Sequence, residues 1–97
     1  MSTFHDDKVW QEAFTALLDL LEMTDEGNDV SVRARKEGMK ILTEIAKAVS
    51  TRRRVEPGLT APIRSLLSVM WAREILTDDQ FGKLDGAYES LGNKLPR

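Results

Sequence analysis

Most of the positive charge of the chain lies in one stretch, residues 29–54. This stretch contains eight of the 14 lysines and arginines but only three acids, so its net charge is +5, whereas the rest of the chain sums to −7. Clustered lysines and arginines bind phosphates and carboxylates, and this chemistry indicates binding rather than catalysis. The residues that we expect to contact nucleic acid or an acidic protein partner are Arg33, Lys36, Lys40, Lys47, Arg52, Arg53 and Arg54.

Helical periodicity separates these cations from the apolar residues of the same stretch. At 3.6 residues per turn, Arg33, Lys36, Lys40, Lys47 and Arg54 form a narrow stripe on one side of a helix. The opposite side carries the apolar and small residues Val30, Ala34, Gly38, Ile41, Leu42, Ile45, Ala48 and Val49. A solvated charged surface is the alternative interpretation of the stripe, since arginines near a helix C-terminus also stabilise the helix through its dipole.

Residues suited to catalysis are scarce. His5 is the only histidine, and we expect it to lie in an exposed tail without a fixed position. There are no cysteines, which excludes disulfides and thiolate metal sites. No phosphate-binding glycine loop, nucleophile–base set or helical metal-ligand motif can be assembled from the sequence. We therefore predict a protein that is not an enzyme and that uses no metal or cofactor.

Apolar periodicity and cap signals predict four helices in one domain spanning residues 1–97. We expect the first helix over residues 6–23, the second over residues 29–54, the third from residue 60 and the fourth from residue 77. Short connections between long helices favour antiparallel neighbours. The predicted fold is therefore all-α, an antiparallel up-down-up-down four-helix bundle.

Cap residues set the expected helix boundaries. Thr77 and Gln80 have the spacing of a capping box at the start of the fourth helix. Asp29 or Ser31 is expected to cap the second helix, because both side chains accept hydrogen bonds from backbone N–H groups. Gly27 suits a left-handed C-cap after the first helix.

The first and third helices have more apolar surface than one small core requires. On the first helix the apolar arc spans about 200°, roughly twice the stripe of a typical surface helix. The excess predicts a homo-oligomer. Its expected interface residues are Trp10, Leu18, Val69, Trp71 and Ile75. The alternative is a purely structural oligomer, in which the basic second helix pairs with residues 1–28 of a neighbouring subunit, whose net charge is −6.

A membrane role is not indicated. No apolar run approaches the roughly 18 residues that a membrane-spanning helix needs. Asp6 and Asp7 lie where a secretion signal would be basic and then apolar. We therefore expect a cytoplasmic protein that contacts no membrane and takes no small-molecule substrate.

Two segments resemble a family of bundle proteins. The segment Phe4-His-Asp-Asp-Lys-Val-Trp-Gln-Glu-Ala13 resembles the opening of the four-helix-bundle proteins encoded in intervening sequences of bacterial large-subunit ribosomal RNA genes. The segment Arg33-Ala-Arg-Lys-Glu-Gly-Met-Lys-Ile-Leu-Thr-Glu-Ile-Ala46 is similar to the second helix of that family. Leu42 stands in place of the family's proline, and Lys47 and Ala48 stand in place of its glutamate and glycine.

This resemblance implies an up-down four-helix bundle that assembles into a ring-like homo-oligomer, with a pentamer as the expected form. A related branch comprises accessory proteins of diversity-generating retroelements, which bind a reverse transcriptase and nucleic acid through a basic bundle surface. Few aromatic residues lie near the basic stripe in the sequence, so we expect base stacking to be weak. Our leading hypothesis is a self-associating helical bundle that binds RNA, DNA or an acidic protein through its basic second helix.

Overall fold

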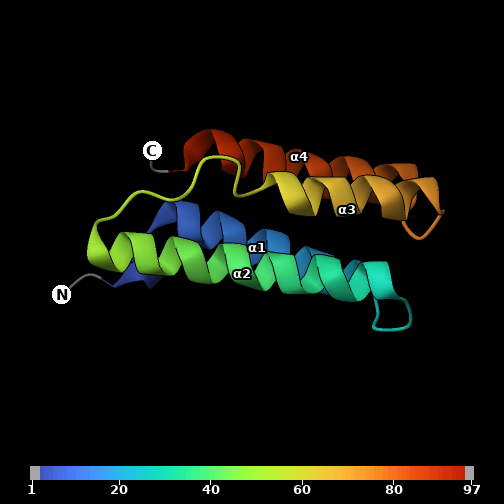
Figure 1. Ribbon diagram of the computed structural model, residues 1–97, viewed down its shortest axis with the longest axis horizontal. Coiled ribbons are helices and arrows are strands. Elements are labelled where there is room, and N and C mark those ends of the chain that lie inside the picture. Colours follow the sequence, from blue (N-terminus) through green and yellow to red (C-terminus); the bar gives the residue numbers. More distant parts are fainter. Residues whose placement is uncertain (1–2, 96–97) are drawn as a thin grey trace.

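Four helices make up the fold in the computed structural model, which describes residues 3–95 (Figure 1). A short 3-10 turn, η1 (Phe4–Asp6), precedes α1 (Lys8–Met23), α2 (Asp29–Thr51), α3 (Ala61–Ala72) and α4 (Asp78–Lys94). Residues 3–95 contain no strand, which confirms the predicted all-α four-helix fold. In the same residues no helix is both long enough and apolar enough to cross a membrane.

Each helix packs against two others. The neighbours of α1 are α2 and α4, and the neighbours of α3 are also α2 and α4, whereas no Cα atoms of the diagonal pairs approach within 8 Å among the described residues. Lys94 at the end of α4 pairs with Glu12 at the start of α1, and Lys83 at the start of α4 pairs with Asp19. These pairs require α1 and α4 to run in opposite directions. Figure 1 shows the same alternation around the bundle, with α1 and α3 antiparallel to α2 and α4.

The core lies along the axis of the bundle and takes residues from all four helices. Its largest fully buried side chains are Leu20, Ile41, Ile45, Ile63, Leu67, Met70, Leu84, Tyr88 and Leu91. Gly38 lies in the middle of α2 because the helices approach closely there. A Cβ at this position would lie 2.8 Å from Leu17 Cδ1 and 3.2 Å from Tyr88 Oη. The close contact explains a glycine at a mid-helix position, where it costs about 1 kcal/mol relative to alanine.

The helix starts follow local cap chemistry. The Thr77 capping box is confirmed, since Gln80 N–H donates to Thr77 Oγ1 at 3.1 Å and Thr77 N–H donates to Gln80 Oε1 at 3.0 Å. The expected cap of α2 by Asp29 or Ser31 is wrong. Asn28 is the N-cap, because its extended backbone places Oδ1 2.8 Å from Ser31 N–H.

The second helix ends earlier than expected, at Thr51 rather than near residue 54. Arg52 follows it in the left-handed conformation, with φ 55°. Arg53 N–H donates to Ala48 O at 2.8 Å and Arg52 N–H donates to Val49 O at 3.4 Å. These two bonds form a Schellman motif, in which glycine usually occupies the position that Arg52 holds.

The end of α1 also differs from the expectation. Gly27 does not have a left-handed backbone. The helix α1 ends at Met23, and its C-cap residue Thr24 is extended. Among the glycines that the structure describes, positive φ occurs at Gly58. The physical reason is Arg35 of α2, whose guanidinium donates to the backbone carbonyls of Leu21 and Thr24 and to Thr24 Oγ1. A side chain therefore satisfies the carbonyl groups that a C-cap glycine would otherwise turn toward N–H donors.

Candidate nucleic-acid interface

The basic stripe of the sequence lies on the outer face of α2. Arg33, Lys36, Lys40 and Lys47 are all exposed, on the side opposite the buried residues of the helix. Lys47 lies 3.7 Å from Glu44, one turn away. Within residues 3–95 no carboxylate pairs with Arg33, Lys36 or Lys40. Their charge is therefore directed to solvent and not used inside the bundle.

Several cations of α3 and α4, by contrast, are neutralised inside the chain. The Arg64 guanidinium donates bidentate hydrogen bonds to the Asp85 carboxylate, at 2.9 and 3.1 Å, and a third hydrogen bond to Glu89 at 3.0 Å. The hydrogen bond with Asp85 raises the pKa of Arg64. Lys83 and Lys94 pair with carboxylates of α1. Arg33, Lys36 and Lys40 of α2 lack such a partner among the described residues, as do Lys8 and Arg73 elsewhere in the bundle.

The arginines after α2 form a separate group at the end of the bundle, which we call the tip. Arg52, Arg53 and Arg54 are exposed, but they lie beyond the helix and do not continue its stripe. Arg53 and Arg54 line a hollow of about 530 Å³ between the last turns of α2 and the connection to α3. The same hollow is lined by Lys47, Glu44 and Glu56, so its charge is mixed.

The turn before α1 is ordered, which corrects the expectation of a tail without fixed position. The His5 ring stacks on Phe4 with centroids 4.1 Å apart, and Trp10 meets both rings edge-on at 5.3 and 5.1 Å. Gln11 Nε2 donates to His5 O at 2.9 Å, and Asp7 caps α1 by accepting from Trp10 N–H. His5 nevertheless remains exposed, as expected. The sequence signal for this order was Asp7, an N-cap that fixes the chain entering the helix.

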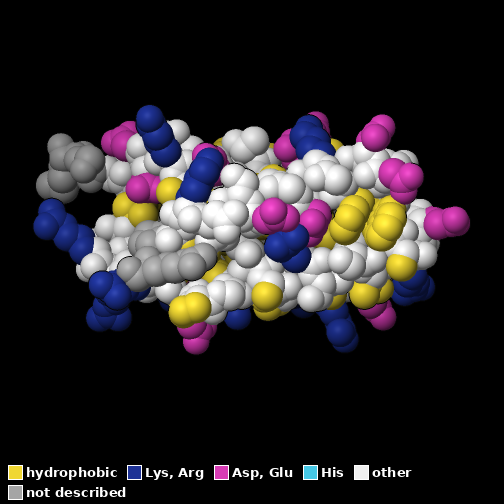
Figure 2. Space-filling model, turned by 90° about the horizontal axis from the view of Figure 1, so that it is seen from above, with side chains coloured by type: hydrophobic (Ala, Val, Ile, Leu, Met, Phe, Trp, Pro, Cys, Tyr) yellow, Lys and Arg dark blue, Asp and Glu magenta, His cyan; other side chains and the backbone are white. Residues whose placement is uncertain are grey.

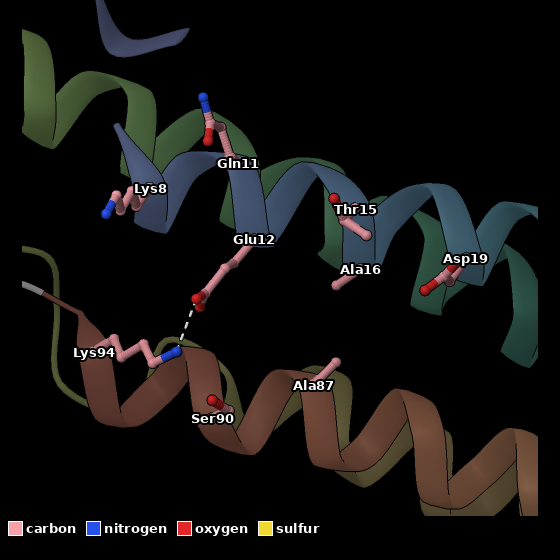
Figure 3. Close-up of a pocket in the computed structure, with 9 residues that line it drawn as sticks. All are labelled: Lys8, Gln11, Glu12, Thr15, Ala16, Asp19, Ala87, Ser90 and Lys94. Carbon is pink, nitrogen blue, oxygen red and sulfur yellow. Dashed lines mark hydrogen bonds and ion pairs between the residues drawn. The ribbon is translucent and has the colours of Figure 1, made fainter. Parts of the chain in front are cut away.

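A groove between α1 and α4 is another concave feature with polar residues in its walls (Figure 3). Its volume is about 530 Å³, and small residues such as Ala16, Ala87 and Ser90 line its middle. At one end Lys94 Nζ donates to Glu12 Oε1 at 2.7 Å. The carboxylates of the groove thus serve as ion-pair partners across the helix seam. Within residues 3–95 no cluster of three or more potential metal ligands occurs.

The predicted interface residues lie on separate surfaces of α1 and α3. Leu18 is 47% exposed on α1, where the stacked rings of Trp10 and Phe14 lie on the same side of the helix. Val69 and Trp71 are exposed on opposite flanks of α3, because residues two positions apart are about 200° apart on a helix, and Ile75 is half-buried against the core. Since α1 and α3 are diagonal in the bundle, no single surface contains both sets. Figure 2 looks onto the α3–α4 face and shows hydrophobic side chains exposed near its right-hand end.

No family model matches the chain, and neither a curated protein nor a solved structure shows significant similarity to it. Fold and surface therefore define its class: a four-helix bundle in which one helix carries unpaired positive charge.

Proposed function

We propose that this bundle binds the phosphates of nucleic acid through α2 and the tip, that it self-associates, and that it is not an enzyme. The observation that carries the proposal is the contrast in charge pairing. Arg64, Lys83 and Lys94 have carboxylate partners within the chain, whereas Arg33, Lys36 and Lys40 have none among the described residues. Exposed cations without partners, arranged along one helix face, fit a polyanion that supplies the missing charge.

The stripe has the dimensions of an extended phosphate contact. Arg33 and Lys47 are 14 residues apart on α2, which corresponds to about 21 Å at the 1.5 Å rise of a helix. The three arginines of the tip add a second group of exposed cations beyond the end of α2. A strand that follows this surface neutralises several phosphates at once, so its affinity should depend steeply on salt.

The test replaces Lys36, Lys40 and Lys47 together by glutamine. Binding of a mixed-sequence single strand should weaken by about two orders of magnitude, and the salt dependence should flatten by about two units of slope. Titrations by fluorescence anisotropy at several salt concentrations measure both quantities. The matched control is the Lys83→Gln, Lys94→Gln variant, which removes lysines that already have partners and should bind like the wild type. Unchanged affinity in the triple variant would contradict the proposal.

Self-association is supported by two exposed apolar surfaces, one around Leu18 on α1 and one around Trp71 on α3. Because they differ in residues and lie on diagonal helices, one surface of a subunit would meet the other surface of the next. Such head-to-tail contacts close into a ring when the rotation between subunits permits it. We propose on this basis, and on the Val9-Trp-Gln11 segment, that the chain is related to the ring-forming intervening-sequence proteins.

Replacement of Leu18 by glutamate or Trp71 by alanine should shift the protein toward monomers, because each change removes one of the two complementary surfaces. Light scattering at several protein concentrations measures the shift.

The purely structural alternative predicts a different result, namely that the triple lysine variant also dissociates the oligomer. This alternative is less supported, because Glu12 and Asp19 of the acidic α1 already pair with lysines of α4. A wild type that is a folded monomer at micromolar concentration would contradict self-association.

A further inference from the structure

A hollow between η1 and the last turns of α2 joins the tip to the aromatic turn. It is lined by Thr3, Phe4, His5, Val49, Ser50 and Arg52, and its volume is about 440 Å³. This volume falls within the roughly 300–1,000 Å³ typical of sites for small organic groups. The hollow therefore has room for a planar ring of the size of a nucleobase, next to positive charge.

The wall on the η1 side presents an aromatic ring held in place from two sides. One contact is the stacking of His5 on Phe4 at 4.1 Å, and the other is the edge of Trp10 at 5.1 Å from His5. The backbone of His5 is fixed as well, by the hydrogen bond from Gln11. A ring that is exposed and yet positioned can stack on a base with little loss of side-chain entropy.

The wall on the α2 side includes Arg52. This residue holds the left-handed position of a Schellman motif, with φ 55°, where a side chain is disfavoured relative to glycine. Arginine also stacks on bases through its planar guanidinium, which lysine cannot do in the same way.

We infer that this hollow receives a base of single-stranded nucleic acid, stacked between His5 and Arg52, while the neighbouring phosphates lie on the tip and on the α2 stripe. The inference rests on the proposed function of α2 and adds the form of nucleic acid that is bound. A duplex keeps its bases stacked inside and offers none to the hollow, so the site selects single strands.

The experiment compares four probes of equal length: oligodeoxythymidylate, oligouridylate, a deoxy strand with abasic sites, and a deoxy duplex. The wild-type protein should bind the deoxy strand with bases about five-fold to a hundred-fold more tightly than the abasic strand, which carries the same phosphates. The duplex should bind more weakly than the single strand. Either order of oligodeoxythymidylate and oligouridylate supports the inference, and the tighter one identifies DNA or RNA as the ligand.

Two variants test the two walls of the hollow. His5→Ala and Arg52→Gly should each bring the ratio of affinities for the base-containing and abasic strands toward one. The ratio cancels the loss of charge in Arg52→Gly, because both strands contain the same phosphates. Met39→Ala is the control for His5, since Met39 is an exposed apolar residue of α2 that does not line the hollow. Glu74→Gly is the control for Arg52, since Glu74 has the same backbone conformation at the end of α3.

The failure of this inference can be distinguished from the failure of the proposed function. Equal affinity for base-containing and abasic strands, with steep salt dependence for both, would overturn the inference and leave phosphate binding by α2 in place. Binding of the duplex as tightly as the single strand would overturn it too. The absence of binding to all four probes would overturn the proposed function and the inference together.

Discussion

Two helices of the bundle end in the same backbone motif but with opposite charge. Arg52 at the end of α2 and Glu74 at the end of α3 both hold the left-handed position, with φ 55° and 62°. Both ends have the hydrogen bonds of a Schellman motif, which at α3 join Ile75 N–H to Met70 O at 2.8 Å and Glu74 N–H to Trp71 O at 3.0 Å. The comparison separates what the backbone motif requires from what the side chain contributes.

The two ends differ in their surroundings. Arg52 lies beside Arg53 and Arg54 and lines the hollow with His5, whereas Glu74 lies at the opposite end of the bundle, four residues before Asp78. Figure 2 shows this polarity, with a basic side chain outermost at the left end and an acidic one outermost at the right end. A helix C-terminus favours a cation and disfavours an anion. The left-handed residue Arg52 therefore lines a candidate site, whereas no candidate site lies beside the left-handed residue Glu74.

The largest expected effect comes from removing the charge of the basic end. Replacement of Arg52, Arg53 and Arg54 by glutamine should lower the affinity for a single strand by about a hundred-fold at about 0.1 M salt, because about three phosphate contacts are lost. Replacement of Glu74 by glutamine and Asp25 by asparagine changes the charge of the other end and should not weaken binding. Anisotropy titrations measure both variants. A gain in affinity of the second variant that is comparable to the loss in the first would show that only net charge matters.

A smaller effect is expected when glycine replaces either left-handed residue, and it is measured as a change in the free energy of unfolding. Glu74→Gly should raise the free energy of unfolding by about 1 kcal/mol, since it relieves the left-handed strain and removes an anion from a helix C-terminus. Arg52→Gly should raise it by less, because the favourable cation at that helix end is lost. Urea denaturation of both variants measures the difference. A destabilised Glu74→Gly protein would show that the Glu74 carboxylate stabilises the fold. The proposed difference between the two helix ends would then be wrong.

The smallest effect is expected from a buried hydroxyl group that lies between the two ends of the bundle and has no hydrogen-bond partner among the described residues. The Tyr88 hydroxyl is fully buried, and no hydrogen-bond partner for it occurs among the described residues. Removing an unpaired buried hydroxyl relieves its desolvation cost, so Tyr88→Phe should stabilise the fold by up to about 1 kcal/mol. Thermal unfolding at neutral pH measures the gain. A loss of stability would indicate a partner for this hydroxyl, such as a bound water.

The same residue gives the stability of the protein a dependence on alkaline pH. Burial raises the pKa of Tyr88 above its ordinary value, and the negative charge of Asp19 raises it further. Above about pH 10 the unfolded chain loses the phenolic proton while the folded chain retains it, so the contribution of Tyr88 to stability falls as pH rises. Because Tyr88 is the only tyrosine, tyrosinate absorbance follows this titration directly. Tyr88→Phe should remove the corresponding part of the alkaline loss.

How far each part of the fold could be predicted depended on how local its cause is. The start of α4 was predicted because Thr77 and Gln80 satisfy each other across three residues. The fourth helix itself was predicted because burial follows apolar periodicity, and its regularly spaced residues Leu84, Tyr88 and Leu91 are all buried. The end of α2 was missed because its Schellman motif uses Arg52 instead of the glycine that normally marks such an end.

The parts of the site that were missed depend on contacts between distant residues. Arg35 was counted among the basic residues of the second helix, yet it binds carbonyls of α1, a role that only the packing of α1 on α2 creates. The meeting of His5 with Arg52 joins residues 47 positions apart and has no periodic signal in the sequence. The width of the apolar arc on α1 was visible, but periodicity does not show that Leu18 and Trp71 end on separate surfaces.

The groove between α1 and α4 has a consequence for how the chain folds and opens. Three of the four helix contacts join sequence neighbours, so they form as local hairpins at a low entropic cost of loop closure. The contact of α1 with α4 is different, because the hydrogen bond between Glu12 and Lys94 links residues 82 positions apart. This seam is hollowed, and α4 contains Gly82, Gly86 and Gly92, which lower its intrinsic helix propensity. Docking of α4 onto α1 therefore carries the largest entropic cost of loop closure among the four helix contacts, and we expect this seam to open more readily than the three local ones.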